Sequence, residues 1–401
     1  MKKLDFLPVL LGSDRNVYGM ARAFYEEYNI KSIALGKRNA RETMGSKILV
    51  PIKEPNLEDD KTFVETLIKL KQQYKETKLI LIACSDVYMK LIINNKDKLK
   101  DSYIIPYVDK KLMDKLVLKE QFYKTCDKYG LIYPKTEICT FKEYKKYAPS
   151  FKFPIIIKPS NSVMYWKCDF VGKKKIFICE SKEEMKDIFN KVYNAGYNDS
   201  LIIQEYIPGD DTKLRVLNAY VDSNHKVTFM GLGQILLEEK APKEIGDYGA
   251  IITTYDKKLM DQIKAFLEDI EFFGYANFDF KYDERTKKYI IFEINIRQGR
   301  SSSFTTLSGY NIVKYLVDDV IYHKKRKIEY LQGRYLWNVV GKKTILKHLK
   351  DEELKKEVKE LYRDKKASNL LFYKKDFGLE RLKNCIILYI RTNQRYNKYY
   401  K

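Results

Sequence analysis

Three side chains with oxygen donors stand on two segments that alternate in the manner of β-strands. Asp279 belongs to NFDFK, and Glu293 and Asn295 belong to FEIN. Successive side chains on a strand point to opposite faces, so Glu293 and Asn295 share one face. Two carboxylates and an amide oxygen suit Mg2+, which retains water and binds phosphate oxygens beside its protein ligands. The segments predict a magnesium site, and the alternative is a pair of exposed strands whose polar faces carry acids.

Positive charge and small hydroxyl groups follow the second of these segments directly. Arg297 and Arg300 lie on either side of Gly299, and three serines at 301–303 come next. Fixed cations beside a metal stabilise the charge that develops on a phosphoryl group or an acyl phosphate. The stretch 292–303 is therefore the candidate catalytic segment.

A lysine ends the apolar segment 153–158 and precedes a proline. An unpaired charge in a buried strand is costly, so Lys158 is expected to face an anion such as a phosphate. Further along, Gly172 is followed by three lysines at 173–175. These lysines are expected to form the cationic tip of a hairpin that closes over phosphates, although the loop lacks the glycine-rich pattern of a strong phosphate cradle.

The segment LIIQEYIPGDD, residues 201–211, is predicted to be a strand that breaks at Pro208 and Gly209. Backbone groups at a strand edge, next to apolar side chains, suit a flat purine base. Asp211 is then placed to accept a hydrogen bond from a ribose hydroxyl. This segment predicts a nucleoside site.

Strands and helices alternate in the first part of the chain. Residues 6–11, 30–36 and 78–84 read as buried strands separated by amphipathic helices. This alternation predicts a parallel sheet with ligands at the carboxyl ends of its strands. Such a crevice would be lined by Gly12, Ser13, Asp14 and Asn16. Alternatively, these residues serve only the geometry of the turn.

Composition limits the class of protein. The chain has 401 residues, of which 45% are apolar and 32% charged, and this indicates a folded protein of several domains. The net charge of +22 fits a nucleic acid, an anionic membrane surface or a phosphate-bearing substrate as partner, or a mere preference for lysine and tyrosine. Six cysteines lack the spacing of a zinc site and fit a reduced cytoplasm.

Three features bear on the membrane. No apolar stretch approaches the length of about 18 residues that a transmembrane helix requires. The start MKKLDFLPVLLG is interrupted by Asp5 and Pro8 and is expected to be a strand rather than a signal peptide. Residues 326–401 contain 21 Lys and Arg against 9 Asp and Glu, a net charge of +12. This tail is expected either to rest on an anionic membrane surface or to close the fold as a helix with a solvated face.

The order and spacing of these pieces resemble the ATP-grasp superfamily of carboxylate–amine ligases. The pieces are the lysine of MDK at 113–115, Lys158, the QEYI segment, Asp211 and the acidic cluster. Within the superfamily, the stretches GSDRNVYGMARAF, YIPGDDTKLRVLNAYVD and FEINIRQGRSSSF are similar to the D-aspartate ligase family of Gram-positive cell-wall synthesis. The resemblance runs from about residue 6 into the basic tail.

The resemblance implies a mixed α/β and α+β architecture of the ATP-grasp type. An N-terminal parallel α/β (pre-ATP-grasp) domain would occupy residues 1–112. One ATP-grasp subdomain, with the phosphate loop, would occupy 113–200, and a second, with the adenine hinge and the magnesium site, would occupy 201–325. A basic C-terminal helical extension would follow at 326–401.

The resemblance also implies roles for individual residues. The ATP-binding residues would be Lys115, Lys158, Lys174, Gln204, Glu205, Tyr206, Ile207 and Asp211. The catalytic cations would be Lys158, Arg215 and Arg297. Asp279, Glu293 and Asn295 would hold Mg2+, with two ions expected. The amino acid would lie against Gln298, Gly299, Arg300, Ser301 and Ser302.

Departures from the pattern of D-alanine ligases are visible. The loop at 160–175 is not glycine-rich, and Asn277 stands where those enzymes carry an arginine. Ile296 stands where many relatives have proline. The loop and Asn277 argue against a D-alanine ligase and leave ATP binding intact, and the resemblance to the D-aspartate ligase family tolerates all three differences.

The implied activity is the ATP-dependent ligation of D-aspartate, through its β-carboxylate, to the lysine ε-amine of a peptidoglycan precursor stem peptide. The reaction would pass through an acyl phosphate and release ADP and phosphate. The acceptor would be UDP-linked or lipid-linked, and the enzyme cytoplasmic, with peripheral contact to the inner face of the membrane through the basic tail. The alternatives are a ligase joining another amino acid to another amine, such as a dipeptide synthetase, and a basic nucleic-acid-binding protein. No aromatic–basic recognition motif accompanies the charge, so nucleic acid is not expected as a partner.

Overall fold

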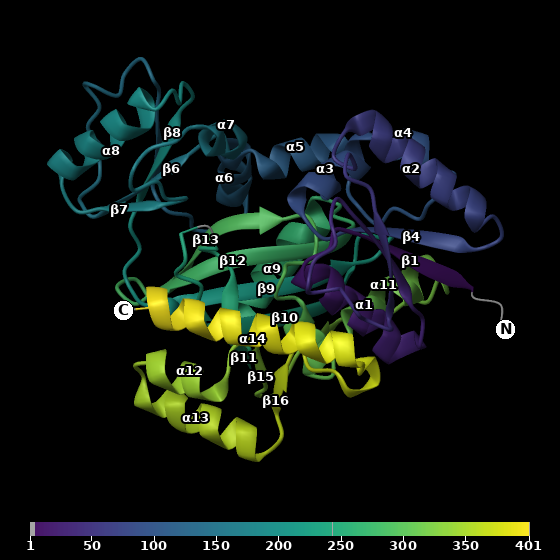
Figure 1. The fold of residues 1–401 in the computed structure, drawn as a ribbon. Helices are drawn as coiled ribbons and strands as arrows, with labels where there is room; N and C mark the ends of the chain where they lie inside the picture. Colours follow the sequence, from purple (N-terminus) through teal and green to yellow (C-terminus); the bar gives the residue numbers. More distant parts are fainter. Residues whose placement is uncertain (1–4, 243, 401) are drawn as a thin grey trace.

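The structure is a computed structural model that describes residues 5–242 and 244–400. Three β-sheets form its framework, and helices pack around them (Figure 1). The small teal sheet with α8 lies at the upper left of the view, above the large central sheet, and the N-terminal sheet lies at the right (Figure 1). The yellow C-terminal helix runs across the central sheet (Figure 1).

The N-terminal sheet is parallel, with strand order β3-β2-β1-β4. Its strands are Phe6–Leu11 (β1), Ser32–Gly36 (β2), Leu49–Lys53 (β3) and Lys78–Ala83 (β4). The helices of this part are Arg15–Tyr28 (α1), Asp60–Gln73 (α2), Asp86–Asn94 (α3) and Lys96–Leu99 (α4). Every residue of β1 and β2 is buried, as in the centre of a parallel sheet. The predicted parallel sheet is confirmed.

Two helix starts lie at one edge of this sheet. Asp14 caps α1 by accepting from the backbone N–H groups of Asn16 and Val17, and Ser85 caps α3. Because β1 and β4 are parallel neighbours, both caps stand at the carboxyl edge of the sheet. Arg15, Asn16 and Asp86 follow these caps directly and line one large cavity.

The small sheet is antiparallel, with strand order β5-β8-β6-β7. Its strands are Thr136–Cys139 (β5), Ile155–Pro159 (β6), Phe177–Cys179 (β7) and Leu201–Glu205 (β8). Helices Lys110–Val117 (α5) and Lys119–Lys128 (α6) lead into it, and Ser162–Lys167 (α7) and Lys182–Asn194 (α8) belong to it. It has an apolar core of its own, which includes Ile155, Phe189 and Tyr197.

The central sheet has eight strands, in the order β13-β12-β9-β10-β11-β15-β16 with β14 beside β10. Its first five strands are Leu214–Val221 (β9), Val227–Glu238 (β10), Tyr248–Thr254 (β11), Gly274–Asp283 (β12) and Lys288–Asn295 (β13). A 3-10 turn at Asp211–Lys213 precedes β9. The accompanying helices are Lys257–Asp269 (α9), Ser303–Leu307 (α10) and Ile312–Val320 (α11).

The C-terminal extension contributes strands as well as helices. It contains Glu329–Tyr330 (β14), Leu336–Asn338 (β15) and Ala367–Asn369 (β16), together with a 3-10 turn at Lys374–Asp376. Its helices are Lys342–His348 (α12), Glu352–Arg363 (α13) and Leu379–Tyr399 (α14). The expected helices are present, and the three short strands extend the central sheet. None of the helices within 5–242 and 244–400 has the length and apolar character to cross a membrane.

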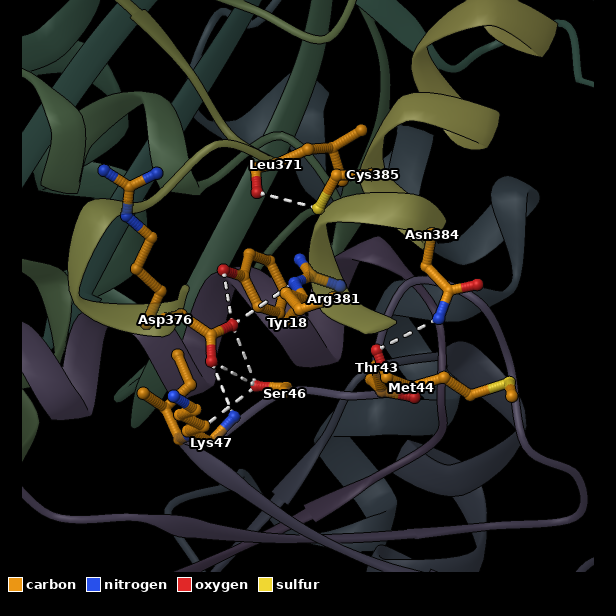
Figure 2. Close-up of polar contacts among 12 residues, drawn as sticks. Tyr18, Thr43, Met44, Ser46, Lys47, Leu371, Asp376, Arg381, Asn384 and Cys385 are labelled. Atoms are coloured by element: carbon orange, nitrogen blue, oxygen red, sulfur yellow. Dashed lines mark hydrogen bonds and ion pairs between the residues drawn. The ribbon is translucent and has the colours of Figure 1, made fainter. Parts of the chain in front are cut away.

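A buried ion pair docks α14 on the N-terminal part (Figure 2). Arg381 Nε lies 3.2 Å from Asp376 Oδ2, and both side chains are almost fully buried. Asp376 also accepts from the hydroxyl of Tyr18 at 2.9 Å and from the backbone N–H of Lys47 at 2.6 Å. The Arg381 guanidinium stacks 3.9 Å from the centre of the Tyr18 ring. The extension is therefore an integral part of the fold.

Candidate active site

One large cavity, with a volume of about 1340 Å³, lies where the three sheets meet. The N-terminal part contributes Arg15 and Asp86, and the small sheet contributes Lys158 and its neighbours. The central sheet contributes the acidic pair on β12 and β13. The sequence-predicted site residues that line the cavity are Lys158, Gln204, Glu205, Tyr206, Ile207, Asp211, Asp279, Glu293, Asn295, Arg297, Gly299, Arg300 and Ser301.

The predicted metal ligands lie on paired antiparallel strands. Asp279 on β12 is directly opposite Glu293 on β13, and Asn277 is opposite Asn295. Asn295 Nδ2 donates to Asn277 Oδ1 at 3.1 Å and to Asp279 Oδ2 at 3.4 Å. The Tyr248 hydroxyl donates to Asp279 Oδ1 at 2.7 Å. The pairing places all three predicted ligands on one face of the sheet.

The electrostatics of this pair fit a divalent cation. Burial, followed by the charge of Glu293, raises the pKa of Asp279 to about 7. A cation between the two carboxylates would remove the repulsion that favours the proton. Among the described residues, no group of three or more His, Cys, Asp or Glu could hold a metal by itself. Two carboxylates and one amide leave coordination positions for water and phosphate oxygens, as Mg2+ requires.

Arg297 and Arg300, which follow β13, are held by acidic side chains from other elements. Arg297 makes a bidentate ion pair with Asp86 at the start of α3, with distances of 2.7 and 3.0 Å. Arg300 pairs with Asp247 and lies 3.4 Å from Asp14. Burial raises the pKa of Asp247 to about 6 even though Arg300 opposes the shift.

Arg15, at the start of α1, is a cavity residue that the sequence did not single out. Its Nη2 donates to Thr392 Oγ1 on α14 at 2.7 Å. Burial lowers the pKa of Arg15, because its charge is taken out of water. Among the side chains that the structure describes, no carboxylate lies within ion-pair distance of this guanidinium.

The small sheet supplies a lysine and an apolar wall. Lys158 Nζ on β6 donates to Gln204 Oε1 on the adjacent β8. Gln204 Nε2 in turn donates to Tyr123 Oη and Thr136 Oγ1, both at 2.8 Å. The apolar side chains that line this part of the cavity include Ile138, Ile156, Ile178, Ile202 and Ile207. β8 lies between β5 and β6 and is not the edge strand that the sequence predicted. A flat base would lie between the apolar wall and the end of this strand, at 204–207.

Asp211 lies at the end of this wall and is almost fully buried. Lys240 Nζ donates to its Oδ1 at 2.5 Å, and the backbone N–H of Glu238 donates to its Oδ2 at 2.7 Å. The Tyr400 hydroxyl donates to the same Oδ2 at 2.5 Å. Lys240 and Tyr400 are further cavity residues that the sequence did not single out.

Five sequence-predicted residues lie outside the large cavity. Lys115 lines a separate pocket with Lys124 and Asp269, and Lys174 is exposed on the loop where the neighbouring Lys175 lines the cavity instead. Lys175 Nζ donates to the Ile245 carbonyl at 2.9 Å, and both residues line the cavity.

The other three lie within the protein framework. Arg215 follows the cavity-lining Leu214 on β9, so it points to the opposite face of the sheet, where it donates to the carbonyl oxygens of Thr212 and Leu214. Gln298 is 1% exposed and donates to the Ala83 carbonyl, which ties the catalytic segment to β4. Ser302 is buried beside α10. These positions favour structural roles over the predicted contacts with substrate.

Comparison with known proteins agrees with this geometry. Residues 119–318 match the family model of the carbamoyl-phosphate synthase L chain, ATP binding domain. The chain is 41% identical over 410 residues to the D-aspartate ligase of Enterococcus faecium (strain Aus0004), covering 99% of this chain and 97% of the relative.

Solved structures share the fold at low identity. One is the L-amino acid ligase from Bacillus licheniformis, with a TM-score of 0.52 and 12% identity, covering 79% of this chain and 71% of that one. Another is the biotin carboxylase domain of the Hydrogenobacter thermophilus 2-oxoglutarate carboxylase, with a TM-score of 0.59 and 16% identity, covering 82% and 74%. The fold, the matched ATP-binding domain and the 41% identity all indicate the same family. The chain belongs to the D-aspartate ligase family of ATP-grasp enzymes and is an ATP-dependent carboxylate–amine ligase.

Proposed function

We propose that this enzyme uses ATP to activate the β-carboxylate of D-aspartate and joins it to the lysine ε-amine of a peptidoglycan precursor stem peptide. One observation carries the proposal: a single cavity contains a magnesium-type acidic pair, a strand end with an apolar wall suited to a nucleoside, and two guanidiniums suited to an acidic amino acid. The identity with a D-aspartate ligase over 99% of the chain supports the choice of amino acid.

The chemistry requires an activated acid. A carboxylate is a poor electrophile toward an amine. A β-carboxylate oxygen of aspartate attacks the γ-phosphorus of ATP, the bond to the β-phosphate oxygen breaks, and β-aspartyl phosphate and ADP form. The amine nitrogen then attacks the carbonyl carbon, phosphate leaves with the carboxylate oxygen, and the nitrogen loses a proton. One amide, one ADP and one phosphate result.

The residues of the cavity provide the charges that these reaction steps need. Asp279, Glu293 and Asn295 would hold Mg2+, which would neutralise phosphate charge. Lys158 and Arg297 are fixed cations that line the same cavity and are held by Gln204 and Asp86. Preorganised charges of this kind need no rearrangement when charge develops in the transition state.

Aspartate carries a second carboxylate and an amine, and the cavity holds groups that match them. Arg15 and Arg300 are placed to bind the α-carboxylate, since a guanidinium and a carboxylate form paired hydrogen bonds. Asp247 is placed to accept from the α-ammonium group while Arg300 holds it. This set of charges would favour an acidic amino acid over alanine, whose side chain has no carboxylate to activate.

The proposal also covers the acceptor amine and the place in the cell where the enzyme acts. The lysine amine has a reference pKa of about 10.4 and is therefore protonated at neutral pH. It must lose this proton in the site before its nitrogen can attack. We also propose that the enzyme acts in the cytoplasm, with the exposed face of α14 in peripheral contact with an anionic membrane that carries the lipid-linked form of the precursor.

An amino-acid screen tests the proposed substrates. ADP release is measured with D-Asp, L-Asp, D-Ala and D-Glu, each with and without a UDP-linked pentapeptide that contains lysine. The proposal expects release that depends on both D-Asp and the pentapeptide, and a product whose mass is the sum of the two minus water. Equal or faster turnover with another amino acid or a free amino-acid acceptor would instead assign a dipeptide-type synthetase.

A further inference from the structure

The end of the chain returns to the large cavity. α14 begins at Leu379, close to the buried Asp376–Arg381 pair. It ends at Tyr399, which lines the large cavity. Two contacts near its end hold it there. Arg395 Nη2 lies 2.7 Å from Glu239 Oε2, whose side chain is 4% exposed, and the Tyr396 ring packs so closely that a Cβ on Gly249 would meet it.

Tyr400 is fixed by contacts on three sides. Its ring lies 6.0 Å from that of Tyr396 and 4.9 Å from the His348 ring, and the Lys240 ammonium is 5.6 Å from its centre. Burial and the charge of Asp211 raise the pKa of Tyr400, so its hydroxyl remains protonated. The hydroxyl is therefore the donor in its 2.5 Å hydrogen bond to Asp211 Oδ2.

The contacts of Asp211 determine what it can still bind. An ionised carboxylate accepts about four hydrogen bonds. Asp211 accepts from the Glu238 N–H, from Lys240 and from Tyr400. One acceptor direction is then left for a donor from the cavity, and the three contacts prevent the carboxylate from rotating.

We propose that Tyr400 is a positioning residue of the nucleotide site, which holds the Asp211 carboxylate in the orientation that accepts from a ribose hydroxyl of ATP. The inference rests on the proposed binding of the nucleoside at 204–211. It gives the C-terminal extension a direct part in substrate binding. It also explains why α14 is anchored at both ends, since a small shift of the helix would misplace the hydroxyl.

The test is a comparison of two nucleotides. Dissociation constants for ATP and for 2′,3′-dideoxy-ATP, each with Mg2+, are measured by calorimetry on wild type, Tyr400→Phe and Tyr389→Phe. Tyr389 is on the same helix and outside the cavity, so its variant is the matched control. Loss of one oriented hydrogen bond is expected to weaken ATP binding by about threefold to tenfold in Tyr400→Phe. Binding of the dideoxy nucleotide and both affinities of the Tyr389→Phe variant should stay at the wild-type level.

Asp211→Asn completes a double-mutant cycle. If Tyr400 acts through Asp211, the effect of Tyr400→Phe on ATP binding disappears in the Asp211→Asn background. An equal loss for both nucleotides would overturn the inference, because it would indicate a general structural role. Unchanged or tighter ATP binding by Tyr400→Phe would also overturn it, because the hydroxyl would then be neutral or would compete with the ribose. Wild-type protein that bound neither nucleotide would contradict the proposed function itself.

Discussion

Asp279 and Glu293 face each other across β12 and β13, and burial, followed by the charge of Glu293, raises the pKa of Asp279. Alternation in the sequence was enough to predict this face, because the strand period does not depend on the rest of the fold. The same reasoning missed Arg15, whose partner Thr392 is 377 positions away along the chain. It also missed Tyr400, which is 189 positions from Asp211. Such contacts are set by tertiary packing and leave no local pattern.

Replacing Glu293 with glutamine removes one carboxylate from the proposed magnesium site. We expect kcat to fall on the order of a hundredfold or more, because phosphate charge loses its counter-ion in the transition state. The side chain is exposed, so the fold should be kept. Steady-state ADP release at saturating ATP checks this, with Glu284→Gln, in the turn between the same two strands, as the control. Undiminished turnover in Glu293→Gln would rule out the site.

Replacing Arg15 with glutamine removes a cavity guanidinium that, among the described side chains, has no carboxylate within ion-pair distance. A hydrogen-bonded charge contributes about 1.5–3 kcal/mol, so KM for D-aspartate should rise roughly tenfold to a hundredfold. KM for ATP should change little. Arg38→Gln, at an exposed position, is the control. An equal rise in both KM values would contradict a specific role in binding the amino acid.

At the scale of elements, the parallel N-terminal sheet was predictable because its strands are continuous apolar runs. The three strands of the extension were not predictable, because two or three residues are too few to show a period. The sequence predicts that Gln298 contacts the substrate. In the structure its side chain is buried and donates to the Ala83 carbonyl, a contact 215 positions away along the chain that leaves no local pattern.

The docking of α14 gives a stability prediction. Asp376→Ala would leave Arg381 buried without its counter-ion, and breaking a buried pair costs about 3–5 kcal/mol. Denaturant unfolding followed by circular dichroism should show a loss of this size in the free energy of unfolding. Asp364→Ala breaks the exposed pair with Arg363 and should have little effect. Similar stability of the two variants would show that the buried pair does not hold the helix.

At the scale of the whole molecule, α14 contacts the N-terminal part through Arg381 and the strand end of β10 through Arg395, and Tyr400, just after the helix, contacts Asp211. The outer face of α14 meets solvent. Leu379, Ile386 and Ile390 are 84%, 43% and 47% exposed on that helix. Lys383 and Arg391 are exposed among them. Exposed apolar side chains between basic ones are typical of a surface that rests on anionic lipid.

Vesicle sedimentation tests this surface. Wild type should sediment with vesicles that contain phosphatidylglycerol more than with phosphatidylcholine alone, and less as salt is added. Ile390→Glu should reduce the bound fraction. Val50→Glu, which makes the same change at an exposed position on β3, should not. Equal losses in the two variants would indicate an effect of net charge alone.

The transfer of oxygen from aspartate to phosphate tests the central claim most directly. D-Aspartate labelled with 18O in the β-carboxylate is turned over with ATP and the lysine-containing pentapeptide, and the released phosphate is analysed by mass spectrometry. Activation of the β-carboxylate as an acyl phosphate predicts one 18O atom in each phosphate, and label in the α-carboxylate should give none. Unlabelled phosphate from the β-labelled substrate would contradict the account.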